Sequence, residues 1–146
     1  VKAYAPVVQA AEAAGLKIDF AGMKRTPNTI NAHRLIHWAG IEGRQTFVVH
    51  RLFEAYFRDA RDIGDTYVLA DIADGCEMDA SVVSKLLDAD ADIEDIQKRD
   101  AHSREMGISS VPTFIVANQH AVPGAQPTEM WLKVMGDIMA QIESTE

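Results

Sequence analysis

The chain has 146 residues, of which 47% are hydrophobic and 25% charged, a composition that can bury the core of a globular domain and argues against disorder. Its net charge of -8 disfavours nucleic acid and anionic membrane surfaces as partners, because both would repel it at long range. No apolar run approaches the roughly 20 residues of a membrane-spanning helix, and the single cysteine excludes a disulfide-stapled fold.

The first part of the chain has the pattern of several short helices. Residues 1–14 are alanine-rich and stop at Gly15, whereas residues 16–20 alternate apolar and polar side chains and predict a short extended segment. Helical spacing returns over residues 29–39 and 44–60. Residues 44–60 carry an apolar stripe that is expected to face other helices. It consists of Phe47, Val48, Leu52, Phe53, Tyr56 and Phe57.

Two aspartates then stand where helix N-caps are expected. Asp65 precedes a helical pattern that runs to Gly75, and Asp79 precedes another. The side chains predicted to point inward from these helices are Val68, Leu69, Ile72, Val82, Val83, Leu86 and Leu87. Up to about residue 89 the sequence therefore predicts a helical subdomain.

The last part changes to helix, strand, strand, helix. A helix over residues 90–106 ends at Gly107, and strands follow at residues 113–116 and 121–122, with a turn at 118–120 between them. The final helix is predicted to bury Met130, Trp131, Val134, Met135, Ile138 and Met139. Two strands alone make a marginal sheet with open edges, so further strands are expected to complete it.

The bond between Val111 and Pro112 is the most informative local feature. Proline cannot donate to a strand and biases the preceding residue towards extended geometry, so Pro112 should open the first strand or lie at its edge. A Val-Pro bond is also one of the few at which a cis peptide is cheap. A cis bond here would turn the Val111 backbone outward to face a ligand, whereas a trans proline would only end the helix.

Three segments carry a resemblance to a known family. One is Arg25–Thr29 followed by Ala32–Leu35, the next runs from Leu52 to Asp65, and the third is the proline loop Gly107–Val116 together with Gly124–Pro127. In these segments the chain resembles the DsbA-like thioredoxin family, and within it the FrnE-like branch. Relatives usually have glycine where this chain has Ser110, a conservative difference.

The resemblance implies an α/β fold, the closing half of a thioredoxin-like domain with an inserted helical domain. Residues 1–89 correspond to the helical insert and residues 90–146 to the closing half. The leading strand-helix-strand unit that would carry the Cys-x-x-Cys pair has no counterpart here, and Cys76 has no partner cysteine. Because Val1 is not methionine and falls inside a helical pattern, we expect a truncated polypeptide. No signal peptide is visible, and we expect a cytoplasmic protein.

By resemblance, the function is thiol-disulfide oxidation or isomerisation of a protein or small-molecule dithiol, without a cofactor. The Val111 peptide, held by Pro112 and flanked by Ser110, would bind a substrate strand through main-chain hydrogen bonds. Asn28 and Thr29 would line the cleft that faces the active site, although a plain helix-capping role is favoured for them. Gln126, just before the last helix, would also contact substrate or act as a cap.

Two other functions remain open. The glutathione-dependent 2-hydroxychromene-2-carboxylate isomerases share the fold, but they tend to have an acidic residue in the region of Gly124–Gln126. A chain without the redox motif would alternatively be an inactive helical interaction module, and its open sheet edge would recruit a partner or a second copy.

No metal site is predicted. Asp88, Asp90 and Asp92 have the alternate spacing of a calcium loop, but the glycine and glutamate that such a loop needs are missing. His33 and His37 lie one helical turn apart without an evident third ligand.

Overall fold

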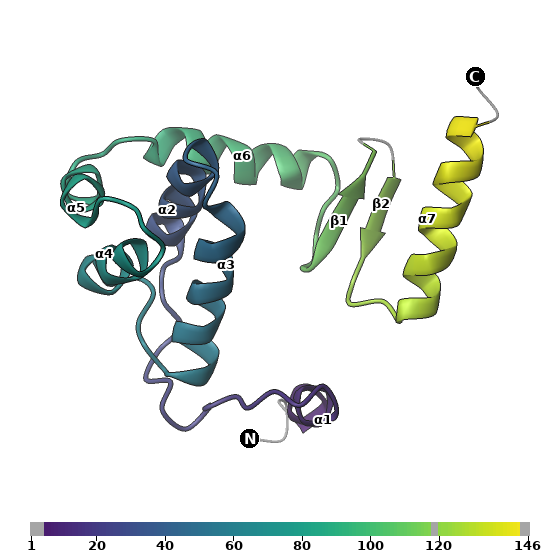
Figure 1. The fold of residues 1–146 in the computed structure, drawn as a ribbon, viewed down its shortest axis with the longest axis horizontal. Coiled ribbons are helices and arrows are strands. Elements are labelled where there is room, and N and C mark those ends of the chain that lie inside the picture. The colour runs from purple at the N-terminus through teal and green to yellow at the C-terminus, as the bar shows by residue number, and fades with distance from the viewer. Residues whose placement is uncertain (1–4, 118–119, 144–146) are drawn as a thin grey trace. The chain divides into compact units, whose positions relative to one another are not determined.

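The structure is a computed structural model that describes residues 5–117 and 120–143. The chain divides into two compact units, Val1–Arg99 and Asp100–Glu146, and each is described by itself. Figure 1 shows the elements in chain order, from α1 in purple to α7 in yellow.

The first unit consists of short helices. They are α1 (Ala5–Ala13), α2 (Ile30–Ile41), α3 (Gln45–Phe53), the π-helix η2 (Glu54–Arg58), α4 (Thr66–Gly75), α5 (Ala80–Asp88) and the first part of α6 (Ile93–Glu105). The predicted helices are thus confirmed, except that residues 1–4 lie outside the described ranges and that the helix expected over 44–60 changes to a π-helix at Glu54. The predicted extended segment at residues 16–20 forms no strand, and the Asp19 N–H donates to the Phe57 carbonyl at 2.8 Å.

Two of these helices begin at the predicted aspartate caps. The Asp65 carboxylate accepts a hydrogen bond from the Tyr67 N–H at 2.8 Å, and the Asp79 carboxylate accepts from Ser81 and Val82 at 2.9 and 3.0 Å. These bonds satisfy backbone donors that the first turn of a helix leaves without intrahelical partners. The start of each helix is therefore determined by neighbours in the chain.

The hydrophobic core of the first unit lies among α2, α3, α4 and α5. Its fully buried members include Leu35, Val48 and Leu69. The remaining buried side chains of this cluster are Ala32, Trp38, Ala39, Leu52, Ala55, Ile72, Ala73, Cys76, Met78, Val83 and Leu87. The inward positions predicted on α4 and α5 are confirmed for four buried side chains, Leu69, Ile72, Val83 and Leu87. Val68 and Leu86 are partly buried and pack against this cluster.

In the first unit, three of the side chains predicted to point inward are exposed instead. Val82 is 48% exposed, because adjacent helical residues point about 100° apart and Val83 takes the core-facing direction. On α3, Val48 and Leu52 are one turn apart and face the core, so Phe47 and Phe53 lie on the flanks and are 64% and 59% exposed. The apolar stripe on α3 is therefore wider than the part of this helix that packs against the core.

A buried arginine ties α2 to the end of α5. The Arg34 guanidinium donates to the carbonyls of Leu86, Leu87, Ala89 and Ala91 and to the Asn31 side chain. Its side chain is almost fully buried, and the guanidinium also lies 5.0 Å from the Trp38 ring centre. Burial lowers the pKa of Arg34, and the charges of Asp92 and Asp90 offset part of that effect. These contacts satisfy carbonyls that the C-terminus of α5 leaves free.

The second unit begins within α6 and continues into a hairpin. Gly107 has a φ of 84° and follows the end of α6, where the Ile108 N–H donates back to the Ser103 carbonyl at 3.1 Å. Strands β1 (Thr113–Val116) and β2 (His120–Pro123) pair antiparallel, with Phe114 opposite Val122. Both predicted strands are confirmed, and residues 118–119 of the predicted turn lie outside the described residues.

Helix α7 (Thr128–Glu143) closes the second unit. Trp131 packs edge-on against Phe114, with 4.9 Å between ring centres, but the methionines expected in the core are exposed: Met130, Met135 and Met139 are 41%, 56% and 61% accessible. A two-stranded sheet offers too little apolar surface to cover a helix of this length. No helix in the described part of the chain is long and apolar enough to cross a bilayer.

Candidate functional site

The loop before β1 exposes its backbone. The Val111–Pro112 peptide bond is cis, one of the two isomers that the sequence leaves open, and Val111 is 91% exposed. Two hydrogen bonds close the loop on either side of Val111. The Thr113 hydroxyl donates to the Ser110 carbonyl at 2.7 Å, and the Gly124 N–H donates to the Pro112 carbonyl at 2.7 Å. Within the described ranges, the Val111 N–H has no hydrogen-bond acceptor.

Gln126 belongs to the same unit but is turned towards its own loop. Its side-chain amide donates to the Pro123 carbonyl at 2.6 Å. Pro123 in turn is paired with Thr113 across the hairpin. The structure therefore brings Ser110, Val111, Pro112 and Gln126 into one connected loop system, in which the Gln126 amide holds the chain between β2 and α7.

Asn28 and Thr29 lie in the first unit, at the start of α2. The Asn28 side chain accepts a hydrogen bond from the Ile30 N–H at 3.0 Å, which is the capping geometry favoured from the sequence. Thr29 occupies the N-cap position, but its hydroxyl makes no cap hydrogen bond. These two residues and the Val111 loop belong to different units of the chain.

Thr29 also lines an apolar pocket of about 440 Å³ between α2 and the α3–η2 segment. The residues that surround it are Thr26, Pro27, Thr29, Ala32, His33, Ile36, Val49, Leu52, Phe53, Tyr56, Phe57 and Ile63. Several of these aromatic residues are predicted from the sequence to lie in the core, and the pocket is therefore not predicted. The available signal was that the 44–60 stripe has more apolar side chains than one helix face can bury.

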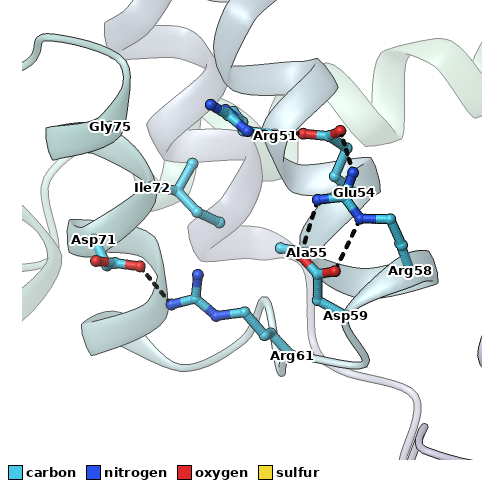
Figure 2. Close-up of a pocket in the computed structure, with 9 residues that line it drawn as sticks. All are labelled: Arg51, Glu54, Ala55, Arg58, Asp59, Arg61, Asp71, Ile72 and Gly75. Carbon is cyan, nitrogen blue, oxygen red and sulfur yellow. Dashed lines mark hydrogen bonds and ion pairs between the residues drawn. The ribbon is translucent and has the colours of Figure 1, made fainter.

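A second, polar pocket of about 240 Å³ lies between the α3–η2 segment and α4 (Figure 2). Its charged lining residues are Arg51, Arg58, Arg61, Glu54, Asp59 and Asp71. Each arginine donates to one of these carboxylates at 2.6 to 3.0 Å. The charges inside the pocket compensate each other, so it does not have the surplus positive charge that an anion would need.

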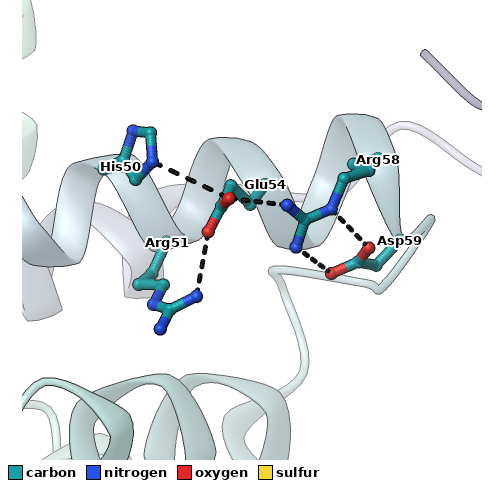
Figure 3. A network of polar contacts seen from close by, with 5 residues as sticks. All are labelled: His50, Arg51, Glu54, Arg58 and Asp59. Carbon is teal, nitrogen blue, oxygen red and sulfur yellow. Dashed lines mark hydrogen bonds and ion pairs between the residues drawn. The ribbon is translucent and has the colours of Figure 1, made fainter. Parts of the chain in front are cut away.

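Glu54 is the centre of the charge network shown in Figure 3. It accepts from Arg51 at 3.0 Å and from Arg58 at 2.6 Å, and the His50 ring nitrogen lies 3.7 Å away. Desolvation tends to raise the pKa of Glu54, but the hydrogen bond from Arg51 and the charge of Arg58 outweigh it and hold this pKa below its usual value. Glu54 is therefore an anion at neutral pH and not a proton donor.

Cys76 is buried in the core at the end of α4. Burial raises the pKa of its thiol, and the charges of Arg51 and Arg44 only partly oppose this. At neutral pH the thiol stays protonated and is a poor nucleophile, as expected for a cysteine that fills space. The described residues contain no group of three or more His, Cys, Asp or Glu side chains placed to hold a metal ion.

The protein-family model of the DSBA-like thioredoxin domain matches residues 4–136. The chain is 28% identical over 129 residues to the uncharacterized protein YwbO of Bacillus subtilis (strain 168), a match that covers 87% of this chain and 64% of YwbO. It also resembles the crystal structure of a probable DsbA oxidoreductase, SCO1869 from Streptomyces coelicolor, with a TM-score of 0.80 and 25% identity over 92% of this chain and 58% of that one. The chain thus spans less than two thirds of the length of each relative. The predicted DsbA-like fold is confirmed, and the chain belongs to the DSBA-like thioredoxin domain family.

Proposed function

We propose that this chain forms the substrate-docking part of a DsbA-like thiol-disulfide oxidoreductase or isomerase, with the reactive Cys-x-x-Cys outside these 146 residues. Membership of the family supports thiol chemistry. An exchange cycle needs an attacking thiolate and a second thiol that resolves the mixed disulfide. Cys76 is a single, buried and protonated thiol and meets neither need.

The observation that carries the proposal is the Val111 N–H, which has no acceptor among the residues that the structure describes. The carbonyls of Ser110 and Pro112 are hydrogen-bonded inside the unit, and Val111 itself is 91% exposed. An extended substrate segment can accept from such a donor in the manner of strand addition. Its cysteine would then be held in line for attack by a thiolate from the remainder of the enzyme.

The other residues have supporting roles in this proposal. Residues 90–146 act as the closing half of the thioredoxin-like domain, and residues 1–89 act as its helical insert. The apolar pocket that Thr29 lines supports a substrate-binding role for this residue in the helical insert, and Asn28 lies beside it in the chain. Gln126 stabilises the loop, because its side-chain amide donates a hydrogen bond to the Pro123 carbonyl.

A titration with a short extended peptide tests the proposal. The probe is a synthetic peptide with β-branched residues around one S-methylated cysteine, which prevents covalent reaction with Cys76. In ¹⁵N–¹H spectra of the 146-residue chain, we expect the Val111 amide resonance to shift on addition of the peptide, because its N–H acquires an acceptor. A control peptide in which ester bonds replace the backbone amides beside the cysteine should bind more weakly, because an ester carbonyl is a weaker hydrogen-bond acceptor than an amide carbonyl.

Two results would contradict the proposal. One is an unchanged Val111 resonance at saturating peptide. The other is that the 146-residue chain by itself accelerates insulin reduction by dithiothreitol and loses this activity in Cys76→Ser, since Cys76 would then be the reactive thiol.

A further inference from the structure

Thr113 is the first residue of β1, and its hydroxyl lies next to the Val111 loop. Its Oγ donates to the carbonyl of Ser110, three residues earlier, at 2.7 Å. The Thr113 backbone is paired with Pro123 in the hairpin. The side chain is thus anchored on a regular element and reaches back to the exposed loop.

The Ser110 carbonyl and the Val111 N–H belong to the same peptide group. In a planar trans peptide these two groups point in opposite directions. Among the described residues the only cis bond is Val111–Pro112, so the Ser110–Val111 peptide is trans. The hydrogen bond from Thr113 to the carbonyl therefore aims the Val111 N–H away from Thr113.

The opposite side of Val111 is held as well. The Gly124 N–H donates to the Pro112 carbonyl at 2.7 Å, so the peptide that follows Pro112 is tied to the end of β2. With both neighbouring carbonyls engaged, rotation of the Ser110–Val111 peptide is restrained mainly by the Thr113 hydroxyl. Loss of this hydroxyl would leave the N–H with a range of directions and add an ordering cost to docking.

We infer that the Thr113 hydroxyl is a positioning group, which sets the direction of the Val111 N–H towards a bound extended chain. This inference rests on the proposed docking function of the Val111 loop. A hydroxyl that only closed the turn would change the stability of the hairpin. It would leave the affinity for a peptide unchanged in the folded protein.

Two substitutions separate the positioning role from a structural one. Thr113→Val keeps the shape of the side chain and removes the donor, whereas Thr113→Ser keeps the donor and removes a methyl group. With the S-methylated peptide described above, we expect Thr113→Val to bind roughly two- to tenfold more weakly, the effect of about one hydrogen bond. Thr113→Ser should bind like the wild type.

Two controls are read from the same samples. The Ser110 carbonyl carbon resonance should move in Thr113→Val without peptide, because that carbonyl loses its donor. The cross-strand contacts between Phe114 and Val122 should persist in both variants, which shows that the hairpin is intact.

The outcomes distinguish this inference from the proposal on which it rests. Equal affinity of Thr113→Val and wild type, with the hairpin intact, overturns the positioning role and leaves the docking function standing. Equal weakening in Thr113→Val and Thr113→Ser also overturns it, because Thr113→Ser keeps the hydroxyl and the loss of affinity would then not depend on that donor. No binding to the wild type overturns the docking function itself, and the inference with it.

Discussion

Arg34 shows how one side chain can connect segments that are far apart in the chain. A charged side chain is seldom fully buried unless its donors are used, and here the guanidinium bonds to carbonyls around the end of α5. The planar fork of arginine serves several acceptors at once, which the point charge of lysine does not. Nearby, the Trp38 ring N–H donates to Asp92 at 2.8 Å. Asp92, rejected as a calcium ligand, thus has a structural role.

Arg34→Lys should therefore destabilise the protein strongly. We expect a loss of about 3 kcal/mol in the free energy of unfolding, because the carbonyls around the end of α5 lose donors and the lysine charge stays buried. Denaturant unfolding followed by circular dichroism measures it. Arg25→Lys is the matched control, since Arg25 pairs with Asp62 at the surface with 67% of its side chain exposed, and should cost less than about 1 kcal/mol. Similar costs for the two variants would contradict the role of Arg34.

At the scale of the element, the α3–η2 segment departs from the regular helix that its apolar spacing predicts over residues 44–60. The Asp59 N–H donates to the Glu54 carbonyl, five residues back, at 3.1 Å, and the Arg61 N–H donates to the Ala55 carbonyl at 2.8 Å. Such a widened turn often lies beside a functional site. Here it carries Glu54 and Arg58, which line the polar pocket.

The charge network on this element predicts an acid-sensitive contribution to stability. The pKa of Glu54 is lower in the folded chain than in the unfolded chain, so its contribution is fully present above the unfolded value of about 4.3 and is lost as the pH falls through the folded value. Glu54→Gln should lower the melting temperature at pH 7. The melting temperature of this variant should also fall less than that of the wild type as the pH is lowered. Thermal melts across this pH range measure both effects.

Ionic strength provides the check on this prediction. The partners of Glu54 are more than half exposed, so concentrated salt should reduce the difference between wild type and Glu54→Gln. An identical acid profile for the two proteins at low salt would show that the network adds nothing to stability.

At the scale of the whole molecule, the two units differ in how much they bury. The main core cluster lies entirely within Val1–Arg99. Among the described residues of Asp100–Glu146, Val122 is the one buried hydrophobic side chain, while Phe114, Ile115 and Leu132 are 44%, 48% and 66% exposed. A hairpin and one helix with so little burial are marginal in water.

Separate fragments should therefore behave differently. We expect residues 1–99 to melt cooperatively, because they contain the whole main cluster, and residues 100–146 to lack a cooperative transition. Thermal circular dichroism of the two fragments measures this. A cooperative melt of monomeric 100–146 would contradict the prediction, and its concentration dependence would reveal stabilisation by self-association.

Much of the candidate site could be predicted from residues close together in the chain. The Ser110–Pro112 loop was predicted from the Val-Pro pair and the strand that follows it. The Thr113 hydroxyl was missed, although it bonds only three residues back, because a hydroxyl at a strand start does not reveal its acceptor. The hydrogen bond from the Gln126 amide to the Pro123 carbonyl could not be predicted either. A glutamine before a helix has the same sequence pattern whether it caps the helix or bonds to the preceding loop.

By itself the sequence determined the helices, the aspartate caps, the glycine stop at Gly107 and the hairpin, and its motifs indicated the DsbA-like family. These features depend on hydrogen bonds and apolar spacing within a few residues. Only the tertiary structure decided that Arg34 is buried, that Phe47 and Phe53 are exposed and that Cys76 is inert. Those outcomes depend on which distant carbonyls and side chains surround each residue, and local spacing does not encode that.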